Sequence, residues 1–243
     1  MKKSLKEVNF RVSALAERQE FYEKEFSIAK VKSWFRKNKI PLPQLCAIDA
    51  GSDTGIIYDK KNMNKMLYFK FSELKNKIKK YVPEDVYYDR NYYINPDKIL
   101  NSLKFNQHAF DAHFAQELVF DIDVDNIGKK VSGSNLKSAY KIAIKLKKEL
   151  NKKFNFKKMK IVYSGRGFHI HVLDKKAYSF TIKERDFLNK QISKYPIDPW
   201  VSRGFIRLIR MPYTLNSLVS RVVTPINDAS SFIEKYTLPK FLK

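Results

Sequence analysis

The amino-acid sequence predicts a mixed α+β domain, in which strands and helices alternate without the strict strand–helix–strand rhythm of a parallel sheet. Short runs rich in strand formers, such as Glu117–Val124 and Phe168–Leu173, are interleaved with longer segments whose apolar residues recur at helical spacing. Of the 243 residues, 44% are hydrophobic and 30% are charged, a balance typical of a folded globular chain. We expect one domain over residues 1–243, with its chemical motifs within 117–225 and residues 1–116 as its N-terminal part.

The N-terminal third predicts both helices and strands. Apolar residues recur at helical spacing over 15–37 and predict a helix that ends before Pro41. Two strands around a Gly-Ser-Asp turn and a short basic helix are expected to follow, over 45–49, 55–59 and 70–80.

The central region predicts a strand followed by a long helix. In the strand 117–124, side chains alternate, so Asp121 and Asp123 are expected on one face and Ile122 and Val124 on the other. Ser134 is expected to cap the helix. The helix would bury a stripe formed by Leu136, Tyr140, Ala143, Leu146 and Leu150. Its outer face would be basic, with Lys137, Lys141, Lys145, Lys148 and Lys152.

Two more strands and another helix complete the prediction. The strands, 160–163 and 168–173, are joined by the turn Ser164-Gly165-Arg166-Gly167, and the helix covers about 181–193.

The charge is the most unusual bulk property. The chain carries 48 Lys and Arg against 25 Asp and Glu, a formal net charge of +23. Such a surface favours a polyanion, most often nucleic acid, and less often an anionic membrane surface. A bias towards lysine without a function is the alternative.

The sequence also predicts where the protein works. It has neither a long apolar run nor an N-terminal apolar segment typical of a secretory signal, so membrane spanning and export are not expected. The single cysteine, Cys46, excludes an internal disulfide framework. We expect a cytoplasmic protein in a reducing compartment.

Asp121 and Asp123 form the first chemical motif. Two carboxylates on one face of an apolar strand repel each other unless a cation lies between them. Mg²⁺ and Mn²⁺ prefer oxygen ligands and often bridge carboxylates to substrate phosphates. The alternative is a solvated strand face.

The second motif joins the turn 164–167 to His169 and His171, which share a strand face. Glycines let backbone amides approach a phosphate, and Arg166 and His169 would add donors. The alternatives are a structural hairpin with a partly buried histidine, or a zinc site, for which four histidines and one cysteine offer few ligands.

The third motif places Asp198 before three arginines, Arg203, Arg207 and Arg210. If 203–211 is a helix, the arginines form one stripe that would bind phosphate. A solvated helix face is the alternative.

In order along the chain, the segments Leu118–Asp123, Tyr163–Val172 and Ile197–Ser202 with Leu208–Pro212 resemble the motifs of the small catalytic subunit of archaeal and eukaryotic DNA primase. The resemblance implies the archaeo-eukaryotic primase core, a sheet related to RNA-recognition folds and flanked by helices.

The resemblance also implies roles for individual residues. Asp121, Asp123 and Asp198 would be the catalytic residues that bind two Mg²⁺ or Mn²⁺ ions. The triphosphate would be bound by Ser164, Arg166, His169 and Arg210, with Asn216 at a position where the family often has a histidine. Lys137, Lys141, Lys145, Arg203 and Arg207 would contact nucleic acid.

The sequence departs from the family in one further respect. The family usually has a zinc-binding module between its first two motifs, but residues 124–160 contain neither Cys nor His, so no structural zinc is expected. This predicts a minimal form of the family.

The resemblance predicts template-directed synthesis of short RNA primers on single-stranded DNA from nucleoside triphosphates, assisted by a large subunit that carries an iron–sulfur cluster. Two alternatives remain: a primase-polymerase that extends primers with deoxynucleotides, as in repair or plasmid replication, and a non-catalytic module that binds single-stranded nucleic acid.

Overall fold

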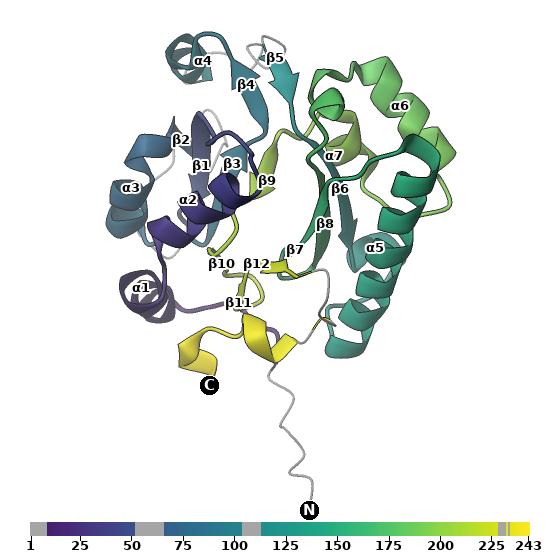
Figure 1. Ribbon diagram of the computed structural model, residues 1–243. Coiled ribbons are helices and arrows are strands. Elements are labelled where there is room, and N and C mark those ends of the chain that lie inside the picture. Colours follow the sequence, from purple (N-terminus) through teal and green to yellow (C-terminus); the bar gives the residue numbers. More distant parts are fainter. Residues whose placement is uncertain (1–8, 52–65, 104–112, 228–231, 233) are drawn as a thin grey trace, which may run out of the picture.

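The structure is a computed structural model that describes residues 9–51, 66–103, 113–227, 232 and 234–243. It has two four-stranded antiparallel sheets near the centre of the molecule, and helices lie on the outer side of each sheet (Figure 1). The predicted mixed α+β class, with sheets flanked by helices, is confirmed. Within the described ranges, no helix has both the length and the apolar character that crossing a bilayer requires.

The first sheet is built largely from the N-terminal half. Its strand order is β2 (Met66–Lys70), β1 (Leu45–Asp49), β3 (Asp85–Asp89) and β9 (Leu208–Arg210). It is covered by the helices α1 (Leu15–Lys24), α2 (Ile28–Lys37) and α3 (Leu74–Tyr81). Buried aromatic and aliphatic side chains of these elements form one core, which includes Phe21, Trp34, Phe35, Leu74 and Val86.

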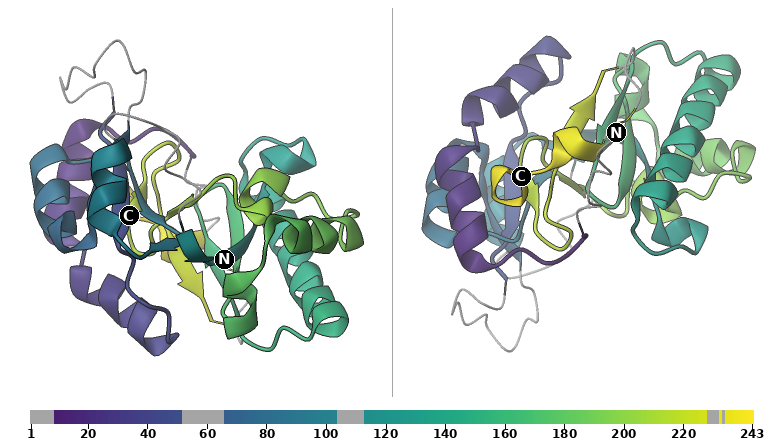
Figure 2. Two further views of the ribbon diagram at one scale, coloured as in Figure 1. Left: turned by 90° about the horizontal axis from the view of Figure 1, so that it is seen from above. Right: turned by 90° about the horizontal axis from the view of Figure 1, so that it is seen from below.

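The second sheet carries the first two predicted motifs. Its strand order is β12 (Thr224–Ile226), β7 (Met159–Tyr163), β8 (Gly167–Val172) and β6 (Leu118–Asp123). Its outer face is covered by α5 (Gly133–Phe154) and α6 (Ile182–Gln191). Figure 2 shows these helices and α1–α3 on opposite sides of the molecule, with the C-terminal strands between them.

Side-chain alternation along β6 gives each face of the second sheet its own role. Phe120 and Ile122 are fully buried in the core beneath α5. Val119, from the opposite face, belongs to the core of the first sheet. Asp121 and Asp123 are two and four residues after Val119, so they lie on the same face as Val119, which is directed towards the first sheet, as the alternation predicts.

Shorter elements connect the two sheets. They are the strand pairs β4 (Asn91–Tyr93) with β5 (His113–Gln116) and β10 (Leu215–Asn216) with β11 (Arg221–Val222), and the helices α4 (Pro96–Leu103) and α7 (Pro199–Arg203). Single turns of 3₁₀ helix lie at Phe71–Glu73, Asp125–Ile127, Lys175–Ser179, Glu234–Thr237 and Lys240–Leu242.

Several predicted elements in the N-terminal half are confirmed with changed bounds. The strand 45–49 is β1. The predicted helix 15–37 is two helices, because the Ser27 side chain accepts the backbone N–H of Lys30 (3.4 Å) and starts α2 anew. The basic helix expected from residue 70 begins at Leu74, after β2 and a 3₁₀ turn. The strand expected over 55–59 lies outside the described residues.

The long helix α5 begins two residues earlier than a Ser134 cap allows. The Ser132 hydroxyl accepts the backbone N–H of Asn135 (3.2 Å), so Ser132 is the cap. The predicted basic face is confirmed as exposed, with Lys137, Lys141, Lys145, Lys148 and Lys152.

The predicted helix 203–211 is wrong. Helix α7 ends at Arg203, because the next residue, Gly204, has a φ of 97°, the left-handed conformation that favours glycine. The chain then enters the first sheet as β9, where Ile209 pairs with Tyr88 of β3. The pairing with a distant strand overrides the local spacing, so the three arginines do not form one stripe.

Candidate functional site

Asp121 is a strongly perturbed carboxyl group of the predicted site. Its cross-strand partner is His169 of β8, and its Oδ1 atom lies 3.6 Å from His169 Nε2. This Oδ1 atom is buried and has no hydrogen-bond partner among the described residues. Burial, followed by the negative charges of Asp123 and Asp198, raises the pKa of Asp121 to about 7. Burial also raises the pKa of Asp123.

The chain brings Asp198 next to β6 through the backbone. The N–H of Asp198 donates to the carbonyl oxygen of Asp121 (2.9 Å), and the carboxylate of Asp198 accepts the N–H of Trp200 (2.8 Å) as the cap of α7. The structure therefore brings the backbone of Asp198 beside the strand that carries Asp121 and Asp123, although Asp198 is more than seventy residues away in sequence.

These carboxylates fit a divalent cation in part. The unpaired, buried Oδ1 of Asp121 and the repulsion among the three carboxylates favour a cation. Within the described parts of the chain, however, no three His, Cys, Asp or Glu side chains are already gathered closely enough to hold a metal ion. The carboxylate of Asp198 in particular is engaged in capping α7.

The predicted phosphate-binding turn is a tight hairpin between β7 and β8. The Ser164 hydroxyl accepts the N–H of Gly167 (3.1 Å), so this side chain holds the turn. Gly167 has no room for a side chain, because an added Cβ would collide with the carbonyl oxygen of Ile122 on β6. Arg166 forms an ion pair with Asp125 and lies 3.7 Å from Asp123. The turn is thereby fixed directly beside the end of β6.

Asn216 lies against this turn. Its Nδ2 atom donates to the carbonyl oxygen of Ser164 (2.9 Å), and its Oδ1 atom is buried without a hydrogen-bond partner among the described residues. The structure thus brings Asn216 to the second motif, and its buried Oδ1 acceptor is unpaired among the described residues.

Arg210 reaches the site from the first sheet. It forms an ion pair with Asp85, and its guanidinium lies over the ring of Tyr87, 5.2 Å from the ring centroid. Burial opposes its charge, but Asp85 and Tyr87 raise the pKa of Arg210 above its usual value, so it stays charged. Its positive charge in turn acts to lower the pKa of Asp121, which places it within electrostatic range of the carboxylates.

His169 is neutral in this environment. Burial, together with the charges of His171, Arg210 and Arg90, lowers its pKa well below the usual value. Its Nδ1 atom has no hydrogen-bond partner among the described residues. A neutral imidazole here can donate or accept one hydrogen bond from a ligand.

A buried network anchors this face of the second sheet to the first. The Tyr88 hydroxyl of β3 donates to Glu117 (2.7 Å), and Glu117 also contacts His171 Nδ1 (2.8 Å). Burial disfavours the charged carboxylate, but His171, Tyr88 and Arg90 outweigh it and lower the pKa of Glu117. His171 therefore belongs to this anchor and not to a phosphate site.

The five predicted nucleic-acid contacts differ in their exposure. Arg207 is buried, with its guanidinium 3.5 Å from Asp89 and 5.1 Å from the ring centroid of Tyr68, so its proposed place on an exposed stripe is wrong. Arg203 is partly exposed at the end of α7 and forms an ion pair with Asp186. Lys137, Lys141 and Lys145 lie on the exposed side of α5.

Sequence reasoning missed three acidic residues of the site. Asp125 continues the alternation of Asp121 and Asp123, so the sequence pattern could have predicted that it belongs to the site. Asp85 and Glu117 carried no comparable signal, because their partners Arg210 and His171 are distant in sequence.

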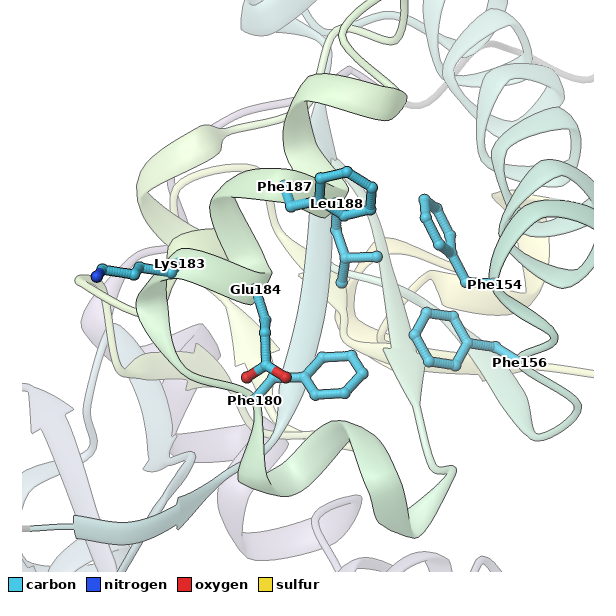
Figure 3. A pocket seen from close by; sticks show the side chains of 7 residues that line it. All are labelled: Phe154, Phe156, Phe180, Lys183, Glu184, Phe187 and Leu188. Atoms are coloured by element: carbon cyan, nitrogen blue, oxygen red, sulfur yellow. The ribbon is translucent and has the colours of Figure 1, made fainter.

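An apolar pocket of about 390 Å³ lies apart from these residues (Figure 3). It opens between the end of α5 and the start of α6, and its walls are Phe154, Phe156, Phe180, Lys183, Glu184, Phe187 and Leu188. None of the predicted site residues lines it.

Comparison with known proteins supports the resemblance. A family profile described as DNA primase small subunit matches residues 120–193. An uncharacterized DNA primase small subunit-like protein of Archaeoglobus fulgidus is 34% identical, covering 96% of this chain and 91% of that protein.

Named DNA primase small subunits are more distant. Those of Picrophilus torridus and Pyrococcus furiosus are 28% and 29% identical over 60% and 75% of this chain. The matches span only 39% and 49% of those two proteins. Among solved structures, the polymerase domain of Mycobacterium tuberculosis ligase D in complex with DNA has a TM-score of 0.49, with 9% identity over 99% of this chain and 93% of that one.

The match to the Archaeoglobus fulgidus protein extends over nearly the whole of both chains. The family profile covers the strand with Asp121 and Asp123 and the hairpin with Arg166 and His169. The chain therefore belongs to the DNA primase small subunit family.

Proposed function

We propose that this chain is a primase catalytic subunit, which synthesises short RNA primers on single-stranded DNA from nucleoside triphosphates. One observation carries the proposal: Asp121 and Asp123 lie at the end of β6 beside a basic and glycine-flanked hairpin, the backbone of Asp198 is hydrogen-bonded to that of Asp121, and buried polar atoms here lack partners among the described residues. Such an arrangement favours a ligand that brings both cations and phosphate oxygens.

Asp121 and Asp123 would hold two divalent ions, Mg²⁺ or Mn²⁺, with Asp198 as the third ligand. When bound, the ions would lower the pKa of the attacking 3′-hydroxyl and neutralise charge on the leaving pyrophosphate. For this, the side chain of Asp198 would rotate away from the Trp200 N–H. The role of the three carboxylates is placement and charge, so no protein nucleophile is required.

The triphosphate would lie between the hairpin and β9. Arg210 and Arg166 supply permanent positive charge, and the neutral His169 and the Asn216 amide supply hydrogen bonds. Ser164 shapes the turn that these groups surround. Ion pairs with Asp85 and Asp125 hold the two arginines in place before the nucleotide arrives.

The template strand would be attracted by the basic face of α5 and by Arg203, without sequence readout. A separate large subunit with an iron–sulfur cluster is the proposed partner for initiation. The matches cover only 39% and 49% of the two named family members, so more than half of each of those proteins lies outside the comparison.

The test is incorporation of labelled ribonucleotides on an unprimed single-stranded DNA template with Mg²⁺ or Mn²⁺. We expect products from the native chain and none from Asp121→Asn/Asp123→Asn. Asp97→Asn is the matched control, because Asp97 is an exposed carboxylate of α4 outside the site.

The same assay separates the alternatives. Products with deoxynucleotides on a primed template, and none on an unprimed one, would identify a primer-extending polymerase. Tight binding of the template without any incorporation, with or without a primer, would identify a binding module.

A further inference from the structure

Two aromatic rings stand exposed on the surface beside the candidate site. Trp200 of α7 is 57% exposed and Phe205, just after α7, is 54% exposed. Their ring centroids are 5.5 Å apart, and their planes are inclined by 58°. Side chains of this size usually bury most of their surface, so an exposed aromatic pair indicates a binding surface.

The turn that carries the rings is tightly closed. The N–H of Ile206 donates to the carbonyl oxygen of Trp200 (3.1 Å), and the N–H of Gly204 donates to that of Val201 (3.0 Å). Gln116 Nε2 donates to the carbonyl oxygen of Gly204 (3.0 Å) from the neighbouring strand β5. The rings therefore project from a fixed backbone.

A buried arginine holds the same turn from below. The guanidinium of Arg90 is completely buried and donates to the carbonyl oxygens of Val201 (2.8 Å) and Glu117 (2.9 Å), and also to that of Ile206. A buried charge with this many acceptors makes the turn costly to deform. Since the backbone is held by hydrogen bonds on both sides of the rings, the fold itself keeps the two rings exposed.

The turn is also tied to the candidate acidic centre. Asp198 accepts the N–H of Trp200 with its carboxylate (2.8 Å) and donates its own N–H to the carbonyl oxygen of Asp121 (2.9 Å). Trp200 is thus two residues along the chain from Asp198, one of the candidate catalytic carboxylates. Arg203, on the same short helix, is partly exposed and forms an ion pair with Asp186.

We propose that Trp200 and Phe205 form a stacking platform for an unpaired base of the nucleic-acid strand that enters the site. An aromatic face stacks on any base, which suits a protein that must copy any template. The formal charge of +23 attracts the phosphates of the same strand. This inference rests on the proposed function, because it takes its ligand from the substrate of that reaction.

The chain offers a direct reporter of stacking. It has two tryptophans, and Trp34 is buried, with its ring 4.8 Å from that of Phe35 and 5.5 Å from that of His171. Trp200 is therefore the tryptophan that a ligand can reach. We would titrate the full chain with a thymidine oligonucleotide of about twelve residues and follow tryptophan emission. An oligonucleotide of the same length with abasic sites keeps the phosphates but removes the bases.

We expect the thymidine oligonucleotide to quench the emission, and the abasic one to bind without quenching. Trp200→Leu should weaken binding of the thymidine oligonucleotide about tenfold, as the loss of one stacked base predicts. It should leave the affinity for the abasic strand unchanged. Trp200→Phe, which keeps a ring, should restore most of the affinity while removing the signal. Phe205→Leu should weaken binding in the same selective way.

Other results would overturn the proposal. Equal quenching by both strands, or unchanged affinity of Trp200→Leu for the thymidine strand, would reject base stacking and leave a partner protein as the occupant of the rings. The incorporation assay on the native chain separates this failure from that of the proposed function. Quenching that persists without any incorporation by the native chain would reject the polymerase activity and retain the platform.

Discussion

His169 Nε2 lies 3.6 Å from Asp121 Oδ1, across a strand pair that holds both residues in fixed register. That separation is too long for a strong hydrogen bond. Because burial lowers the pKa of His169 well below its usual value, the ring carries no charge to offset the carboxylate. Asp121 is thus a buried acid whose charge is left for a ligand to balance.

Asp121→Asn should therefore stabilise the protein. The pKa of Asp121 is raised to about 7 in the folded state, against about 4 in the unfolded chain. The ionised carboxylate then destabilises the fold increasingly as the pH rises from about 4 to about 7. We expect the variant to gain about 1–3 kcal/mol in free energy of unfolding at pH 8 without divalent metal, and little at pH 4.5. Urea unfolding at the two pH values measures this. An equal gain at both would contradict the raised pKa.

Divalent metal should reverse that destabilisation. A cation that binds only the folded chain stabilises it by about 2.7 kcal/mol at a concentration of 100 times Kd. We expect Mg²⁺ or Mn²⁺ to raise the melting temperature of the native chain at pH 8 and to leave that of Asp121→Asn/Asp123→Asn unchanged. Asp97→Asn, in which the site is intact, should respond like the native chain. A similar shift in all three proteins would place the metal elsewhere.

Arg210 and Asp85 should be strongly coupled. Both side chains are largely buried, so removing either charge leaves the other without its partner. We expect Asp85→Asn and Arg210→Gln each to cost about 3–5 kcal/mol of stability, and the double variant to cost clearly less than their sum. A double-mutant cycle by urea unfolding gives the coupling energy, and additive losses would show that the pair does not interact.

Gly167→Ala should disrupt the pairing of β6 with β8. The added Cβ would meet backbone atoms of Ile122 and Asp123, which cannot move without opening the strand pair. We expect a loss of about 3 kcal/mol or more, together with loss of nucleotide incorporation. Gly128→Ala is the control, because nothing lies within 4 Å of its added Cβ and its cost is confined to a φ of 67°. Equal effects of the two substitutions would argue against the close approach.

The basic face of α5 should contribute to the salt dependence of strand binding. Replacing Lys137, Lys141 and Lys145 by Gln should reduce the slope of log K against log salt by about 2 if all three neutralise phosphates. The matched control replaces three lysines of α3, on the opposite side of the molecule: Lys75, Lys79 and Lys80. Equal changes in slope would indicate only a general effect of net charge.

Local patterns predicted the strand β6 well, because a two-residue period decides which side chains share a face. The same period put Asp121 and Asp123 together and buried Ile122 on the other side. The basic face of α5 followed equally from helical spacing. These features depend on neighbours within a few residues, which is the range over which sequence patterns are informative.

Features set by distant parts of the chain were missed or misread. The spacing of Arg203, Arg207 and Arg210 fits a helix, but pairing with β3 makes the last of them part of a strand. The proximity of Asp198 to Asp121 came from the resemblance alone. No local sequence pattern predicts the buried hydrogen bonds from Arg90 to the turn after α7, because their acceptors are backbone carbonyls more than a hundred residues away.

The hydrogen bond from Tyr88 to Glu117 links the two sheets, and the geometry of the site depends on how the sheets pack together. Three motifs supply the carboxylates and the hairpin, but β9 delivers Arg210 only when it is paired with β3 and faces Asp85. A fragment limited to 117–225 would contain every predicted catalytic residue and lack the surface that orients them. The motifs alone therefore do not make a complete site. The N-terminal half of the chain contributes to the chemistry as directly as the aspartates do.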